Sequence, residues 1–160
     1  MDAIMQRRSV RRYKDDPFPM EELSSLVEAA RWAPSAGNSQ PWEFLLINDE
    51  KMVRALKSVS PGWLKPAPAL IVICINAKRR TDWSSMDVGA AMQNILLYAH
   101  SEGYGCCPIG SFVVKTVREL LDLPEHLEPV LFITVGLSDE RPPATKRLSS
   151  GELVFKKVGK

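Results

Sequence analysis

The N-terminus concentrates side chains that can bind an anion. Arginine occupies four of the first twelve positions, and Arg7, Arg8, Ser9 and Arg11 lie close together. A guanidinium group binds a phosphate through two parallel hydrogen bonds, and a hydroxyl adds a neutral one. The stretch therefore predicts a phosphate site. A solvated basic terminus or a nonspecific nucleic-acid patch would show the same composition.

A second polar stretch spans residues 33–42 and reads Ala-Pro-Ser-Ala-Gly-Asn-Ser-Gln-Pro-Trp. Pro34 ends the preceding helix, and the small residues after it would let a ligand approach the backbone closely. Ser35, Asn38 and Gln40 offer hydroxyl and amide groups for hydrogen bonding. Turn chemistry alone would account for several of these residues, but it gives no reason for the whole string.

A third stretch, residues 103–110, reads Gly-Tyr-Gly-Cys-Cys-Pro-Ile-Gly. A dinucleotide-binding fingerprint follows a strand and opens a helix, whereas these glycines follow a predicted helix. A P-loop requires a lysine after its last glycine, where this chain has Ser111. Two interpretations stay open: a helix cap followed by a strand, or a backbone segment whose N–H groups face a ligand.

The fourth stretch is a basic, proline-flanked turn that contains Lys146 and Arg147. Taken alone, these two residues would be interpreted as solvent-exposed surface charges. Together, in this order and at this spacing, the four stretches resemble the flavin site of the nitroreductase family. The resemblance extends over about residues 4–154. Alone, none of the four is decisive, and the stretch at 33–42 is the most specific of them.

The resemblance implies a role for each stretch. The family's opening motif, Arg-[Arg/His]-Ser-x-[Arg/Lys], binds the flavin through its first arginine and its serine. The string at 33–42 packs on the flavin of the partner subunit, a backbone N–H of the third stretch reaches flavin N5, and the basic turn closes on the phosphate. The implied cofactor-binding residues are Arg7, Arg8, Ser9, Arg11, Pro34, Ser35, Asn38, Gln40, Pro108, Ile109, Gly110, Lys146 and Arg147.

By the same resemblance, the protein is an FMN-dependent oxidoreductase. It would take hydride from NADH or NADPH and reduce a nitroaromatic, quinone or similar acceptor in a ping-pong cycle. No catalytic side chain is expected, because the flavin ring performs hydride transfer while the protein positions it. Two alternatives remain: a dehalogenase-like or flavin-fragmenting member of the same family, or a small basic nucleic-acid-binding module.

Length and composition are those of one globular domain, residues 1–160, in a chain that is 45% apolar with a net charge of +2. No apolar run is long enough to span a membrane, and no signal peptide is evident, so we expect a cytoplasmic protein without membrane or nucleic-acid partners. Cys106 and Cys107 are adjacent, and only two histidines occur. Neither a disulfide framework nor a metal site is therefore predicted.

Hydrophobic periodicity predicts helices at 20–32, 49–58, 84–102 and 115–121, and strands at 43–48, 69–75, 104–109 and 130–136. The C-terminal tail from about residue 141 is expected to pack on the partner subunit, where its late apolar patch at 153–155 would add a strand. The expected fold is α+β, with a mainly antiparallel sheet of four to five strands flanked by helices; the resemblance supplies this topology.

Two features concern the surroundings of the site. The helix at 84–102 is apolar around nearly its whole circumference, which predicts burial on most sides and hence a subunit interface in an intertwined homodimer. The short connection that precedes this helix leaves little cover for a substrate pocket. Trp63 or Trp83 would supply part of that cover.

Overall fold

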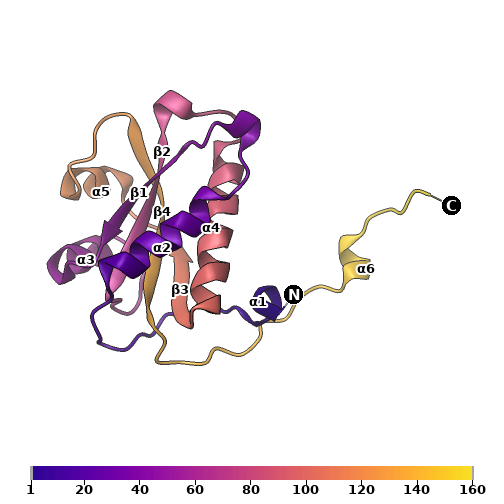
Figure 1. Cartoon of the computed structure of the whole chain (residues 1–160), viewed down its shortest axis with the longest axis horizontal. Coiled ribbons are helices and arrows are strands. Elements are labelled where there is room, and N and C mark those ends of the chain that lie inside the picture. The colour runs from indigo at the N-terminus through magenta and orange to yellow at the C-terminus, as the bar shows by residue number, and fades with distance from the viewer. Residues whose placement is uncertain (1, 160) are drawn as a thin grey trace.

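The computed structural model describes residues 2–159 as an α+β fold around one antiparallel sheet (Figure 1). The four strands lie in the order β1-β2-β4-β3, so β2 and β4 are central and β1 and β3 form the edges. Their bounds are Trp42–Ile47 for β1, Ala69–Asn76 for β2, Tyr104–Ile109 for β3 and Leu127–Leu137 for β4. The predicted fold class and strand number are confirmed.

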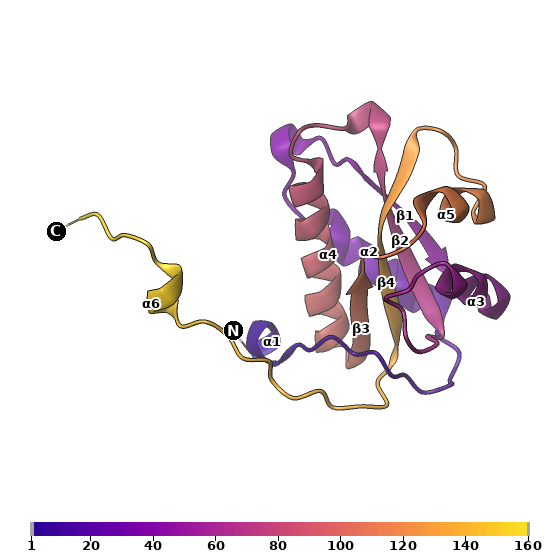
Figure 2. The same ribbon diagram turned by 180° about the vertical axis from the view of Figure 1, so that it is seen from behind.

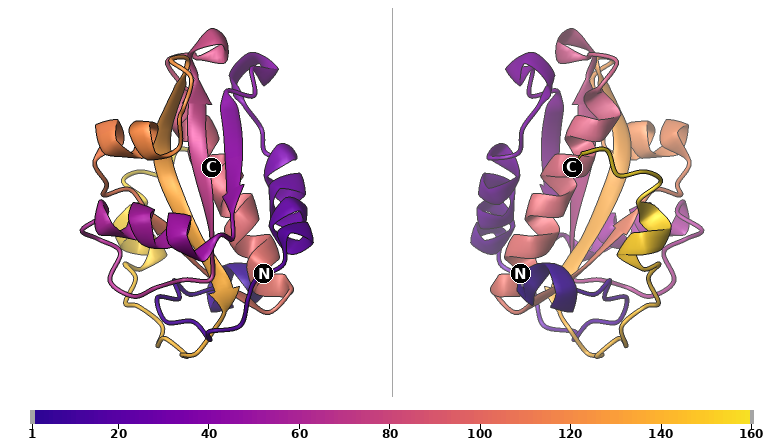
Figure 3. Two further views of the ribbon diagram at one scale, coloured as in Figure 1. Left: turned by 90° about the vertical axis from the view of Figure 1, so that its left-hand side faces the viewer. Right: turned by 90° about the vertical axis from the view of Figure 1, so that its right-hand side faces the viewer.

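Helices cover both faces of the sheet (Figure 3). On one face α2 (Met20–Arg31) and α4 (Ser84–Ser101) pack on side chains such as Ile71, Ile73 and Ile133. On the other face α3 (Glu50–Ser58) and α5 (Val114–Leu120) pack on Leu70, Val72 and Phe132. Because both faces are covered, every residue of β2 is buried, as its continuous apolar run predicts.

The predicted element boundaries are close to those of the structure, with two differences. Strand β4 is longer than predicted, because pairing with β2 and β3 extends it through residues without a clear alternating pattern. The apolar patch at 153–155, predicted to add a strand to a neighbour, forms no strand within its own chain. The segment instead begins in a one-turn helix, α6 (Ser150–Leu153), on an extended tail that leaves the body of the molecule (Figure 2).

Helix α4 is buried along one side and exposed along the other. Val88, Ala91 and Ile95 pack into the core, whereas Met86 is 66% exposed. The apolar sequence of α4 predicts burial on most sides, but its own chain buries only one side of the helix. Among residues 2–159, no helix is long and apolar enough to cross a membrane.

Three further short elements lie at the two ends of α4. The N-terminal helix α1 (Asp2–Gln6) lies beside the end of α4, and two 3-10 turns, η1 (Ala36–Asn38) and η2 (Ala77–Arg79), lie at the other end of the molecule (Figure 1). Gly103 ends the α4 turn with a φ of 82°, the left-handed cap that its position predicts.

Candidate cofactor site

Residues 7–13 form an extended segment, here called the N-terminal arm, that lies along the edge strand β3. Ser9 makes a parallel bridge with Cys106, and the backbone N–H of Val10 donates to the Cys106 carbonyl at 2.9 Å. Gly105 permits this approach, because a Cβ there would lie 2.7 Å from Cγ1 of Val10. The arm therefore covers an edge that would otherwise be open, and it presents its basic side chains beside β3.

The end of the arm is fixed by a buried tyrosine. The Tyr13 hydroxyl lies 2.5 Å from the Val10 carbonyl, to which it donates, and 2.7 Å from the Thr134 hydroxyl. The backbone N–H of Lys14 then donates to the Leu137 carbonyl at 2.9 Å. Burial raises the pKa of Tyr13 far above its usual value, so the hydroxyl stays protonated and keeps its donor. The arm is thus locked to β4 as well as β3.

A carboxylate that the sequence analysis did not single out fastens the middle of the arm. Oε1 of Glu140 accepts the backbone N–H groups of Arg11 at 2.6 Å and of Arg12 at 3.1 Å. Glu140 belongs to the segment after β4 and matches none of the four stretches. A contact between residues so far apart in the chain leaves no local signal in the sequence.

The N-terminal arm, β3 and the segment after β4 line an open cavity of about 480 Å³ beside the end of α4. Its lining includes Arg7, Arg8, His100, Gly105, Glu140 and Arg141. One nitrogen of the Arg8 guanidinium, Nη1, donates to the backbone carbonyls of Met5 and Arg7.

Arg7 is different from its neighbour. Its Nε and Nη1 are buried and have no hydrogen-bond partner among residues 2–159. A buried guanidinium donor without an acceptor is costly, and a phosphate supplies acceptors in the matching fork geometry. The orphaned donors of Arg7 therefore fit the phosphate end of an anionic cofactor.

The end of β3 places a further predicted segment next to the arm. Ile109 lies with Arg11 and Cys107 around a small hollow, and Gly110 follows directly at the end of the strand. Pro108 belongs to β3, where its carbonyl accepts a long hydrogen bond from the Cys107 thiol. The structure thus brings the first and third stretches together.

Two side chains from outside the four stretches also line this hollow. Trp63 and Lys65 line it, from the irregular segment between α3 and β2. Trp63 is 4% exposed and packs edge-on against Phe132, so it belongs to the core and the expectation that it covers a substrate pocket is not supported. Trp83 is 58% exposed at the start of α4.

The two thiols at the site are suited to packing and not to nucleophilic chemistry. Burial raises the pKa of Cys106 well above the usual range for a thiol. Burial also raises the pKa of Cys107, although the positive charges of Arg11 and Arg7 oppose it. Because the thiolate is the reactive form, neither thiol is activated. The part of the chain described, residues 2–159, holds no cluster of three potential metal ligands.

The loop at residues 33–42 has an unusual backbone. Gly37, Asn38 and Gln40 all have positive φ, at 57°, 55° and 44°. The hydroxyl of Ser35 accepts the backbone N–H of Gln40 at 3.0 Å, and the side-chain amide of Gln40 donates to the Asn38 carbonyl at 3.3 Å. The sequence allows a polar turn here, and in the structure its polar groups partly hold the loop itself.

Within one chain, this loop and the arm lie at opposite ends of α4 (Figure 1). The loop meets the helix at Asp87, whereas the cavity beside the arm includes His100. At about 1.5 Å per residue, these two positions on the helix are roughly 20 Å apart. Pro34, Ser35, Asn38 and Gln40 therefore do not join the Arg7 cavity of their own chain.

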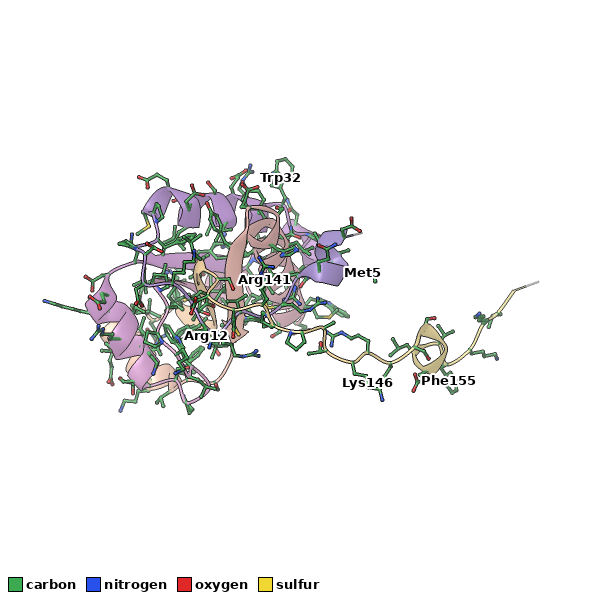
Figure 4. All side chains as sticks on the ribbon, turned by 90° about the horizontal axis from the view of Figure 1, so that it is seen from below. Met5, Arg12, Trp32, Arg141, Lys146 and Phe155 are labelled. Carbon is green, nitrogen blue, oxygen red and sulfur yellow. The ribbon has the colours of Figure 1, made fainter. Side chains whose placement is uncertain are left out.

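The fourth stretch also lies apart from the cavity. Lys146 and Arg147 are exposed on the extended tail, and Arg147 bonds only to the neighbouring Thr145 hydroxyl and Lys146 carbonyl among the described residues. Figure 4 shows Lys146 and Phe155 on the projecting tail, while Arg141 lies against the body. Two of the four predicted stretches are thus assembled by a single chain, and two are not.

Comparison with known proteins identifies the class. The family model described as "Nitroreductase family" matches residues 4–69 and 59–137, and the chain belongs to that family. A relative from Archaeoglobus fulgidus, provisionally named NADH dehydrogenase/NAD(P)H nitroreductase, is 37% identical over 146 residues, or 86% of this chain and 83% of the relative. The resemblance inferred from the four stretches is confirmed, and the protein is an oxidoreductase of this family.

A solved structure and a more distant relative extend the comparison. The chain superimposes on an FMN-dependent nitroreductase from Clostridium difficile with a TM-score of 0.81 and 31% identity, covering 99% of this chain and 98% of that one. An iodotyrosine deiodinase from Thermotoga neapolitana is 27% identical over 173 residues, covering 91% of this chain and 92% of the relative.

Proposed function

We propose that the protein is an FMN-dependent oxidoreductase that uses NADH or NADPH to reduce a nitroaromatic, quinone or similar small acceptor. The observation that carries the proposal is the buried guanidinium of Arg7, whose Nε and Nη1 lack an acceptor beside a cavity of about 480 Å³. The similar Clostridium difficile protein, which is named FMN-dependent, supports the choice of cofactor.

In this proposal the N-terminal arm binds the phosphate. Arg7 and Ser9 are its direct ligands, and Arg8 and Arg11 add positive charge beside them. FMN suits this set better than FAD, because one phosphate-sized basic cluster is present and no fingerprint for an adenosine half accompanies it.

The remaining groups would orient the ring. A backbone N–H of the segment Pro108, Ile109 and Gly110 would face the reactive edge, next to Arg11. When bound, the flavin supplies the hydride acceptor and donor of both half-reactions, so the protein needs no acid–base pair of its own.

The site would be completed by a second copy of the chain. The loop that holds Ser35 and Asn38 meets α4 at Asp87, roughly 20 Å along the helix from His100 at the cavity. Lys146 lies on the projecting tail (Figure 4), and Arg147 follows it. The exposed apolar side of α4, with Met86 at 66% exposure, is the candidate interface. We therefore propose a homodimer of single-domain chains, residues 1–160, with two shared sites.

The purified protein tests the proposal directly. We expect a flavin absorption spectrum, and mass analysis of the released ligand should identify FMN. Addition of NADH or NADPH without oxygen should bleach that spectrum, and a quinone should restore it. A chain that binds no flavin after reconstitution with excess FMN would refute the proposal, and binding of nucleic acid in its place would favour the basic-module alternative.

Reductive dehalogenation is a second candidate, and the Thermotoga neapolitana relative named iodotyrosine deiodinase is the observation that favours it. The connection between β2 and α4 holds only the short turn η2 and a few further residues, which leaves little chain to enclose a specific substrate. Iodotyrosine turnover by the reduced protein, faster than quinone turnover, would establish this alternative.

A further inference from the structure

Asp87 is a buried carboxylate that belongs to none of the four stretches. It lies in the first turn of α4 and is only 6% exposed. Its Oδ1 accepts the backbone N–H of Ala36 at 3.2 Å, and its Oδ2 is buried without a partner among residues 2–159. Burying a carboxylate that is only half satisfied is unfavourable, so a role in the folded protein is expected for it.

The contact of Asp87 falls on the loop with the unusual backbone. The ends of this loop are fixed by regular structure: the Ala33 N–H donates to Ala30 in α2, and the Pro41 carbonyl accepts from Asn76 in β2. The hydrogen bonds of Ser35 and Gln40 join residues within the loop, so they do not attach the loop to the rest of the protein. The bond from Ala36 to Asp87 ties the middle of the loop to a long helix.

Such a tie matters because the loop is strained. Positive φ is uncommon for residues other than glycine, and Asn38 and Gln40 both adopt it. Strained conformations of this kind persist only where the surrounding structure enforces them, and they occur preferentially at functional sites. Without the carboxylate, the 3-10 turn at 36–38 would lose its acceptor on α4 and could relax toward ordinary dihedral angles.

We propose that Asp87 is a positioning residue of the cofactor site, which fixes the turn at 36–38 on α4 so that Ser35 and Asn38 meet the flavin of the partner subunit. The inference rests on the proposed function. Asp87 itself does not touch the cofactor in this assignment. Its effect passes through one hydrogen bond to Ala36.

Asn94 provides a matched control on the same helix. It is partly buried, and its side-chain amide donates to the Ala29 carbonyl of α2 at 3.2 Å. Asn94→Ala therefore removes one tertiary hydrogen bond of α4, as Asp87→Ala does, without touching the loop. Asp87→Asn keeps an oxygen that can accept from Ala36, and Asp87→Leu removes the acceptor while filling similar space.

The experiment measures FMN dissociation constants by fluorescence titration of the full-length chain, together with amide hydrogen exchange of peptides covering residues 33–42. Asp87→Ala should weaken FMN binding at least about tenfold and speed exchange in the loop, whereas Asp87→Asn should stay within about threefold of the original protein. Asn94→Ala should change neither quantity by more than about threefold, although its melting temperature falls.

The outcomes separate the two proposals. Asp87 has no positioning role if Asp87→Ala binds FMN as tightly as the original protein, or if Asn94→Ala weakens binding by the same factor. Should Asp87→Ala fail to fold, Asp87→Leu takes its place, and unchanged loop exchange in that variant overturns the inference. If the original protein binds no FMN, the proposed function itself fails, which the titration shows before any variant is compared.

Discussion

Glu140 accepts the backbone N–H of Arg11 at 2.6 Å, across 129 positions of sequence, and in doing so it fastens the N-terminal arm to the segment that follows β4. A second bond at 3.1 Å to the N–H of Arg12 uses the same oxygen. A carboxylate among arginines would ordinarily be regarded as a salt-bridge partner. Here its oxygen instead binds the backbone, which leaves the side chain of Arg11 available to a ligand.

Glu140→Ala should therefore lower both the stability of the protein and its affinity for FMN. Two backbone donors lose a charged acceptor at a partly exposed position, for which a loss of about 1–3 kcal/mol in the free energy of unfolding is expected. Urea unfolding and FMN titration would measure the two effects.

The neighbouring Asp139 supplies the control for Glu140. Its carboxylate lies 3.7 Å from Arg12 at an exposed position, where an ion pair contributes at most about 1 kcal/mol. Asp139→Ala should leave FMN binding unchanged, and Glu140→Gln, which keeps an acceptor oxygen, should be intermediate. Equal effects of Asp139→Ala and Glu140→Ala would mean that the loss of negative charge weakens FMN binding, and not the loss of the two hydrogen bonds from Glu140 to the N-terminal arm.

Arg7→Ala should weaken FMN binding more than Arg12→Ala. Arg7 has buried, unpartnered donors at the cavity, whereas Arg12 is exposed and already bonds to the Asp139 carbonyl. Loss of a charge-assisted bond to phosphate costs about 1.5–3 kcal/mol, or roughly one to two decades of affinity. Calorimetric titration would decide the order, and equal losses would show that the arginines act only as a diffuse positive field.

Single replacement of His100, His126, Cys106 or Cys107 should leave NAD(P)H-driven quinone reduction within about tenfold of the original rate. A general acid or base typically contributes about 10²–10⁴-fold, so a true catalytic side chain would be detected clearly. Stopped-flow measurement of flavin bleaching and reoxidation separates the half-reactions. Loss of the first half-reaction in a variant that retains FMN would reveal a catalytic group that the proposal lacks.

Asn38→Ala should reduce activity and FMN affinity more than any of those four replacements, because it removes an amide from the proposed surroundings of the ring. It also replaces a residue that tolerates positive φ, here 55°, by one that does not. Asn38→Gly separates these effects, since glycine keeps the backbone conformation without the amide. Full activity of the glycine variant would exclude a role for the side chain.

Truncation after Ser150 should destabilise the proposed dimer and loosen FMN. The removed segment carries an apolar patch in which Leu153 is 67% and Val154 is 45% exposed, and such exposure on a tail is expected to be covered by a partner. Sedimentation velocity with and without FMN would test this, with a double alanine variant of Lys156 and Lys157 as a control that keeps the patch. A stable truncated monomer that still binds flavin would contradict both the interface and the shared site.

Stability should fall in alkaline solution, with Cys74 as one identifiable cause. Burial raises the pKa of this thiol from 9.0 to about 12. Between these values the unfolded chain has lost the proton and the folded chain retains it, so the free energy of unfolding decreases as pH rises, by about 1.4 kcal/mol per unit for one group. Cys74→Ala should show a shallower slope above pH 9 in urea unfolding, although its stability at pH 7 is lower.

Much of the fold follows from local sequence patterns. The continuous apolar run at 69–75 predicts a central strand that is covered on both faces, as observed. Helical spacing and capping residues predict the helix bounds closely. For example, the side chain of Asp49 accepts the Met52 N–H at 2.8 Å. The composition of residues 7–11 and 33–42 likewise identifies candidate ligand groups. These properties depend on neighbours in the chain, so the sequence alone determines them.

Tertiary structure decided how those groups are used. Arg7 differs from Arg8 because the fold buries one guanidinium without a partner and lets the other bond to backbone carbonyls. The roles of Glu140 and Asp87 could not be predicted from the sequence, because their hydrogen-bond partners lie 129 and 51 positions away. Local sequence patterns carry no information about such distant contacts. The loop at 33–42 and the N-terminal arm pack at opposite ends of α4, so the length of this rigid helix keeps them apart within one chain. The sequence does not show this separation, because it depends on where each segment packs on the helix.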